Sequence, residues 1–184
     1  ILDNDTLLTI TSLVDQILCY GEDNGKISLS VDQGKAPYTF LWTKDDESLS
    51  LDNDTIDKLA PGSYRVEVRD ADGKYPTSET FVITQPDSLV VEIQSSVNAS
   101  CDGDNDGQIN INVTGGSSPY TFVWTTTDGL GLNSSSEDQS ALSAGSYMLK
   151  VTDVNGCEAT ISKTLDDSGR KNINSSWFKK DEFF

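Results

Sequence analysis

The sequence repeats itself, and this repetition constrains the fold more than any other feature. Three blocks occur twice: Cys19–Asp32 and Cys101–Thr114, Pro37–Trp42 and Pro119–Trp124, Leu59–Gly73 and Leu142–Gly156. The offset is 82 residues for the first two blocks and 83 for the third, so one copy has a single extra loop residue. A period of this length, with strand-like sequence in every block, predicts two tandem copies of one small domain.

Apolar and polar residues alternate within the blocks, as is typical of half-buried β-strands. The alternating segments are Ile27–Val31, Tyr38–Trp42 and Tyr64–Val68 in the first copy, and Ile109–Val113, Tyr120–Trp124 and Tyr147–Val151 in the second. We expect a first strand at Leu7–Thr11 and Leu89–Ile93, and a last strand at Thr80–Thr84 and Ala159–Lys163. No amphipathic helix of convincing length is visible.

Each copy thus buries one tryptophan among aliphatic and aromatic side chains, a pattern shared by many immunoglobulin-like sandwiches. The predicted fold class is all-β, with two tandem Ig-like antiparallel β-sandwich domains. The proline in Gln85-Pro86-Asp87 ends the first copy. The predicted domains are residues 1–86 and 87–168, with 169–184 as a tail or the start of a further module. The short linker predicts a semi-rigid rod.

The net charge of the chain excludes nucleic acids as partners, and the lack of histidine excludes histidine-based catalysis. The formal net charge of −17 and a pI of about 4.1 repel nucleic acids and anionic membranes. The chain has no histidine, which removes histidine triads, bases and metal ligands. No apolar stretch reaches membrane-spanning length, so no membrane insertion is predicted. The beginning, ILDNDTLLTI, lacks a basic signal-peptide region, which predicts a processed protein or a piece of a longer chain.

The three cysteines do not repeat symmetrically. Cys19 and Cys101 align between the copies, whereas Lys74 stands where Cys157 would have its counterpart. We expect a disulfide between Cys101 and Cys157, which suits an exported protein and leaves Cys19 free unless it bonds outside the chain. The alternative is that Cys101 and Cys157 are two buried thiols that pack together.

An acidic turn in the second copy is a candidate metal site. Asp102, Asp104 and Asp106 alternate before Gly107, as in the first half of an EF-hand loop. Val113 occupies the twelfth position, where an EF-hand needs a bidentate glutamate. The alternatives are a structural Ca²⁺, the only cofactor considered, and a solvated acidic hairpin.

Two kinds of glycosylation signal overlap along the chain. The N-x-S/T motif makes Asn53, Asn98, Asn112 and Asn133 candidates for N-glycosylation, and it also occurs at Asn4 and Asn174. Asp-Ser/Thr-aliphatic triplets, which resemble O-glycosylation sites of Bacteroidota, place further candidates at Thr6, Thr55 and Ser88. The alternative is that Asp-Thr and Asp-Ser simply end turns and begin strands.

No catalytic residues are predicted. The 30 acidic side chains would produce carboxylate pairs by chance, and those visible lie in turns. Tyr38, Trp42, Tyr120 and Trp124 fall on the alternating face that fills the core, which argues against an aromatic sugar platform. Sugar binding through loop residues stays open.

Together, the blocks resemble the SprB repeat. The pattern is Cys, then Asn/Asp-Gly, an I-x-I/L-x-V strand, PYTFxW, GSYxxxVxDxxG and a closing Cys, across about residues 5–168. The first copy departs from the pattern by lacking the closing Cys. The resemblance implies a β-sandwich repeat of very large surface adhesins of gliding and other Bacteroidota, extracellular and typically exported by the type IX system. It implies no catalytic residues.

The predicted function is a non-catalytic repeat segment of a large exported adhesin or extracellular filament, acting as a structural and adhesive rod. One alternative is a carbohydrate- or calcium-binding accessory module of a secreted hydrolase. Another is a self-assembling filament subunit that exchanges strands, for which Trp177–Phe184 would be one donor segment. The expected partners are neighbouring repeats or subunits, with surface glycans as a further class.

Overall fold

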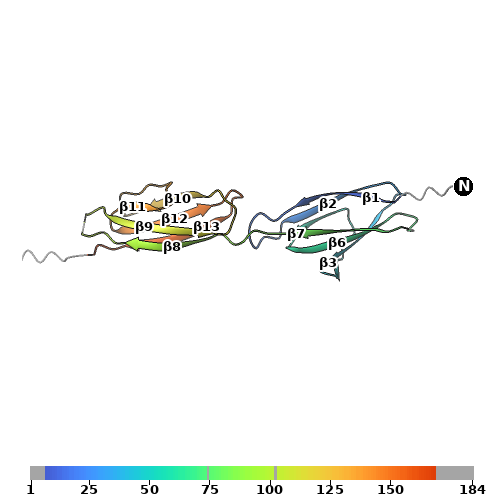
Figure 1. Ribbon diagram of the computed structural model, residues 1–184, viewed down its shortest axis with the longest axis horizontal. Coiled ribbons are helices and arrows are strands. Elements are labelled where there is room, and N and C mark those ends of the chain that lie inside the picture. The colour runs from blue at the N-terminus through green and yellow to red at the C-terminus, as the bar shows by residue number, and fades with distance from the viewer. Residues whose placement is uncertain (1–6, 74, 102, 169–184) are drawn as a thin grey trace, which may run out of the picture. The chain divides into compact units, whose positions relative to one another are not determined.

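A computed structural model describes residues 7–73, 75–101 and 103–168 (Figure 1). The chain divides into two compact units, with the boundary between Ser88 and Leu89. Within the described residues every regular element is a β-strand (Figure 1). In that part of the chain there is no helix able to cross a lipid bilayer.

Unit 1 is a sandwich of two antiparallel sheets. Its strands are β1 (Thr9–Asp15), β2 (Gly25–Asp32), β3 (Thr39–Lys44), β4 (Glu47–Ser48), β5 (Thr55–Leu59), β6 (Gly62–Arg69) and β7 (Thr77–Ile83). One sheet has the order β1-β2-β5 and the other β4-β3-β6-β7. The loop between β2 and β3 therefore crosses from one sheet to the other.

Unit 2 repeats this arrangement. Its strands are β8 (Val90–Val97), β9 (Gly107–Thr114), β10 (Thr121–Thr126), β11 (Gln139–Leu142), β12 (Gly145–Thr152) and β13 (Glu158–Leu165). The sheet orders are β11-β9-β8 and β10-β12-β13, again antiparallel. Where unit 1 has the short strand β4, unit 2 has a longer loop between β10 and β11. The predicted fold class, two tandem Ig-like antiparallel sandwiches, is confirmed.

One tryptophan lies at the centre of each core, as the alternation predicts. Trp42 and Trp124 are 0% and 2% exposed. Each indole nitrogen donates to a backbone carbonyl of the loop that follows: Trp42 Nε1 to Asn53 O and Trp124 Nε1 to Ser136 O, both at 2.9 Å. Burying an indole is favourable only if its N–H finds an acceptor, so these bonds make the central position suitable for tryptophan.

The short strands β5 and β11 are the elements that the alternation does not predict. Ile56 and Leu59 are both buried although they are three residues apart. Lys58, between them, has a φ of 55°, and the register of β5 against β2 shifts at this point. The resulting bulge turns both apolar side chains to the same side, and it hides the two-residue period from the sequence pattern.

At one core position a buried apolar residue of unit 1 is replaced by a buried amide in unit 2. Ile56 faces Ile27 in unit 1, and Gln139 takes the corresponding place opposite Ile109 in unit 2, where it is 2% exposed. The Gln139 amide accepts from Asn133 N at 3.0 Å and donates to Asn133 O at 2.7 Å. A buried amide is tolerated here because the longer loop of unit 2 satisfies it with backbone groups.

Candidate functional site

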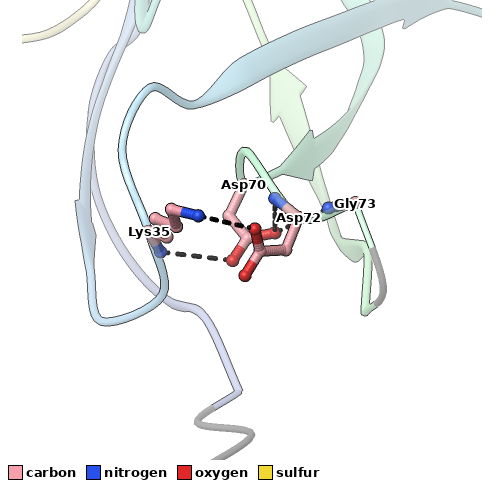
Figure 2. A network of polar contacts seen from close by, with 4 residues as sticks. All are labelled: Lys35, Asp70, Asp72 and Gly73. Atoms are coloured by element: carbon pink, nitrogen blue, oxygen red, sulfur yellow. Dashed lines mark hydrogen bonds and ion pairs between the residues drawn. The ribbon is translucent and has the colours of Figure 1, made fainter.

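An aspartate after β6 holds two segments of unit 1 together. Asp70 Oδ1 accepts from the backbone of its own turn, from Asp72 N at 3.2 Å and Gly73 N at 2.9 Å. Its other oxygen accepts from Lys35 N, in the loop between β2 and β3, at 3.2 Å (Figure 2). We call Asp70 and its counterpart Asp153, with the backbone N–H groups that they accept, the aspartate clamps. Lys35 Nζ and Asp72 also form an exposed ion pair at 3.0 Å, which contributes little to stability.

The clamp of unit 2 is tighter and more buried. Asp153 is 5% exposed and accepts from Asn155 N at 2.8 Å, from Cys157 N at 2.9 Å and, in the loop between β9 and β10, from Ser117 N at 2.9 Å. Burial alone raises the pKa of this carboxyl, but the backbone N–H groups outweigh burial and hold the pKa below its usual value. Asp153 is therefore a charged, fully bonded structural group.

The loop that each clamp holds is shaped to meet it. Gly116, next to Ser117, has a φ of 59°, and a Cβ at this position would lie 3.0 Å from both Asp153 Oδ2 and Leu89 Cδ1. Glycine is needed both for its positive φ and for the close approach of the carboxylate. Sequence reasoning missed the clamps, although the D-x-x-G spacing at Asp70–Gly73 and Asp153–Gly156 was available as a signal.

The predicted Cys101–Cys157 disulfide is wrong. Cys101 is an exposed free thiol, whereas Cys19 and Cys157 are disulfide-bonded. The reason is distance within unit 2. The loop of Cys101 is bonded to the chain just after β13, through Ala99 N to Asp166 O at 3.1 Å, while Cys157 directly precedes β13.

The eight residues of β13 span about 26 Å at ~3.3 Å per residue. The Cα atoms of a disulfide lie about 4.4–6.8 Å apart. Cys101 and Cys157 of one unit thus stand at opposite ends of a strand. The alternative of two thiols packed against each other fails for the same reason.

In the acidic turn, the carboxylate of Asp106 is hydrogen-bonded within the protein. Asp106 accepts from the backbone N of Ser100 at 2.8 Å and also from its hydroxyl. The hydroxyl and then the backbone N–H of Ser100 lower the pKa of the Asp106 carboxyl. Asp102 lies outside the described residues, and among those that are described no three acidic or cysteine side chains are grouped to hold a metal ion. Calcium binding by Asp102, Asp104 and Asp106 stays a prediction.

The glycosylation candidates within the described residues are all exposed: Asn53, Thr55, Ser88, Asn98, Asn112 and Asn133. Two of the asparagine side chains accept hydrogen bonds from backbone N–H groups. Asn98 Oδ1 accepts from Asp166 N at 3.3 Å, and Asn133 Oδ1 accepts from Ser135 N at 3.3 Å. Thr6 lies outside the described residues. Glycan occupancy at these positions stays a prediction.

Two segments of the sequence match a known family of repeats. The SprB repeat model matches residues 11–46 and 93–129. These segments contain β2 and β3 with most of β1, and β9 and β10 with most of β8. Each unit thus contains one segment that matches the SprB repeat. Among curated proteins, none matches the sequence.

Solved structures share the fold of the two units. The three N-terminal domains of the bacteriophage RB49 outer capsid protein Hoc match with 20% identity and a TM-score of 0.51, over 86% of this chain and 58% of that chain. A C-terminal intimin fragment, solved with the intimin-binding domain of its translocated receptor, matches with 17% identity and a TM-score of 0.50, over 87% and 64%. The chain thus spans about three fifths of each of these structures.

The aromatic residues of the two units serve the core. Trp42 and Trp124 are buried, and the half-buried Tyr38 and Tyr120 donate their hydroxyls to Gln33 O and Gly115 O at 2.7 Å. A hollow on unit 1 is lined by Thr43, Asp45, Asp46, Ser63, Arg65 and Thr80, without an aromatic side chain. This lining offers hydrogen-bonding groups but no platform on which a sugar ring could stack.

Proposed function

We propose that the chain is a non-catalytic repeat segment of a large exported cell-surface adhesin or extracellular filament, in which the SprB repeats act as structural and adhesive modules. The SprB match and the Ig-like fold both support a structural repeat module. The disulfide-bonded Cys19 and Cys157 fit a protein that matures in an oxidising compartment outside the cytoplasm.

The observation that carries this proposal is that the residues shared by the two repeats belong to the scaffold of the fold. They share the buried tryptophan, the tyrosine whose hydroxyl bonds the backbone four residues earlier, and the aspartate clamp. The pairs are Trp42 and Trp124, Tyr64 and Tyr147, and Asp70 and Asp153. All of these groups stabilise the sandwich, while the exposed loops differ. Shared scaffold with divergent loops is what a spacer needs, whereas a repeated enzyme would keep exposed catalytic groups.

Two carboxylates of the second unit, the buried Asp153 and the exposed Asp106, accept hydrogen bonds from backbone N–H groups. Asp153 and Asp106 both accept N–H donors, and both have lowered pKa values. A general acid needs a raised pKa, so these residues are tuned for charge and not for proton transfer. The acidic surface, at a net charge of −17, keeps neighbouring copies apart and in solution.

The first test of the proposal is location. Antibodies raised against residues 7–168 are applied to intact cells of the source organism, with an antibody against a cytoplasmic protein as control. We expect surface labelling before permeabilisation. Labelling that appears only after permeabilisation contradicts an exported surface protein.

The second test separates a structural from a ligand-binding role. In the parent protein, residues 7–168 are deleted, or replaced by two unrelated Ig-like domains of similar size. A structural role predicts that deletion weakens attachment of the cells and that the unrelated domains restore it. If only the native repeats restore attachment, the repeats themselves bind the surface, as in the sugar-binding alternative.

A further inference from the structure

The turn between β12 and β13 contains an exposed Asn-Gly step. Asn155 and Gly156 are both exposed, and a Cβ added at Gly156 would meet no atom within 4 Å. Asparagine deamidates most readily before glycine, because glycine has no side chain to hinder the attack of its backbone nitrogen on the asparagine side chain. The step is therefore open to water and carries no glycine side chain that would slow this reaction.

The glycine N–H of this step is held by the clamp of unit 2. Gly156 N donates to Asp153 O at 3.1 Å. Burial raises the pKa of the Asp153 carboxyl, but N–H donors that include Ser117 N and Gly156 N outweigh it, so Gly156 N also points towards the carboxylate. The carboxylate further accepts from the N–H groups on either side of Gly156, from Asn155 N at 2.8 Å and Cys157 N at 2.9 Å. Three consecutive N–H groups thus converge on one buried aspartate.

The first repeat holds the corresponding glycine in the same way. Gly73 N donates to Asp70 O at 3.1 Å and to Asp70 Oδ1 at 2.9 Å (Figure 2). Asp72 precedes this glycine, and an aspartate at this place reacts through the same cyclic imide with loss of water instead of ammonia. A glycine N–H that donates to the clamp aspartate is therefore common to both repeats.

Deamidation needs this N–H to be released. The Gly156 nitrogen gives up its proton and attacks the side-chain carbonyl carbon of Asn155. A bond forms between these two atoms, the bond from that carbon to Nδ2 breaks, and ammonia leaves with the proton. Water then opens the cyclic imide at either carbonyl and gives aspartate or isoaspartate. The Asp153 carboxylate opposes the first step, because its charge disfavours an anionic nitrogen beside it and its hydrogen bonds hold the turn in one conformation.

We propose that Asn155 is a deamidation site, and that the Asp153 clamp suppresses the reaction while unit 2 is folded. Isoaspartate would add a methylene to the main chain between Asn155 N and Cys157 N, which lie 2.8 and 2.9 Å from the same carboxylate oxygen. The modified turn no longer fits both hydrogen bonds, so the modification weakens the clamp that delayed it. The change runs in one direction only, and this inference does not depend on the proposed adhesin function.

The test compares the full chain, residues 1–184, with its Asp153→Ala variant. Both are incubated in neutral buffer, and a wild-type sample in urea gives the rate without a folded clamp. Peptide mapping by mass spectrometry follows the conversion of Asn155 to aspartate and isoaspartate. We expect the folded wild type to react far more slowly than the urea sample. Asp153→Ala is expected to react about tenfold faster than the folded wild type, since losing a hydrogen bond to a charged group raises the open population by about that factor.

Two controls separate release of the glycine N–H from a general loss of stability. Gly107→Ala places a Cβ 2.8 Å from Leu142 O, which strains unit 2 but leaves the clamp in place. It is expected to leave the rate at Asn155 close to that of the wild type. Asp70→Ala, which opens the clamp of the other unit, is expected to do the same. Equal acceleration by Gly107→Ala and Asp153→Ala overturns the proposal.

Asp153→Asn covers the case in which the alanine variant does not fold. It removes the charge but keeps a carbonyl oxygen for Asn155 N and Cys157 N, and hydrogen exchange of β12 and β13 verifies that unit 2 is folded. We expect deamidation of Asn155 that is faster than in the wild type. A folded Asp153→Asn chain that reacts no faster than the wild type, or a folded wild type that reacts as fast as in urea, contradicts the protective role of the clamp.

Discussion

Replacing Asp153 with alanine is expected to destabilise unit 2 by about 3 kcal/mol. The carboxylate accepts three backbone N–H groups at 2.8–2.9 Å. Asn155 is exposed, so water can replace the lost bond there, whereas Ser117 and Cys157 are half-buried. A hydrogen bond to a charged group contributes about 1.5–3 kcal/mol, and two such bonds at the lower end of the range give the estimate.

Two further variants calibrate the value. Asp153→Asn keeps one carbonyl oxygen for Asn155 and Cys157 but loses the bond to Ser117, so we expect about half of the loss. Asp70→Ala is the matched control in unit 1, where the clamp is half-exposed and two of its bonds are 3.2 Å long. For Asp70→Ala we expect a loss of about 1 kcal/mol, since hydrogen bonds that are longer and more exposed to solvent contribute less to stability.

Native-state hydrogen exchange with mass spectrometry measures each unit separately, because peptides of β12 and β13 report on unit 2 and those of β6 and β7 on unit 1. Asp153→Ala is expected to speed exchange in β12 and β13 alone. A loss below about 1 kcal/mol, or equal losses from Asp153→Ala and Asp70→Ala, would refute the argument that the buried carboxylate holds the β9–β10 loop against the β12–β13 turn.

The same group predicts a dependence on pH. The pKa of Asp153 is lowered in the folded protein, and an aspartate in the unfolded chain has a pKa of about 3.9. The stabilisation is therefore complete above about pH 4 and is lost as the pH falls through the folded value. The difference in free energy of unfolding between the wild type and Asp153→Asn is expected to shrink below pH 4. A difference that grows towards acidic pH contradicts the assigned direction.

Three other substitutions test the scaffold of unit 2. Tyr147→Phe removes a hydroxyl that donates to Ser143 O at 2.9 Å, and a loss of about 1–2 kcal/mol is expected in thermal unfolding. Gln139→Ile leaves backbone groups of the preceding loop unpaired, so hydrogen exchange is expected to show a loss of about 2 kcal/mol in the stability of unit 2. Unchanged exchange rates would mean that water pairs with these loop groups instead. Gly107→Ala places a Cβ 2.8 Å from Leu142 O, and urea unfolding is expected to show a loss of about 1–3 kcal/mol.

The core of each unit was predictable from the sequence because its chemistry is local. Alternation within five to eight residues determines which side chains face inward, and Trp42 and Tyr64 lie where the alternation places them. Strand β5 was not predictable, since the bulge at Lys58 breaks the period on which the prediction depends.

The candidate sites were harder to predict because they depend on which ends of strands come together. Cys101 and Cys157 look like a pair when only the chain order is known, yet the loop of Cys101 lies beyond the far end of β13. Asp153 is one of 30 acidic residues, and nothing in its own segment shows that its carboxylate meets Ser117 in the loop between β9 and β10.

The buried Gln139 of unit 2 has a consequence for folding. Neighbouring domains of similar sequence can exchange strands and misassemble. If β5 entered unit 2, Ile56 would leave the backbone of Asn133 without the amide that pairs with it, and β11 in unit 1 would bury the amide of Gln139 in an apolar site. Each unpaired buried group costs about 1–3 kcal/mol. This core position thus penalises the exchange of β5 and β11 between the units and favours pairing of each strand within its own unit.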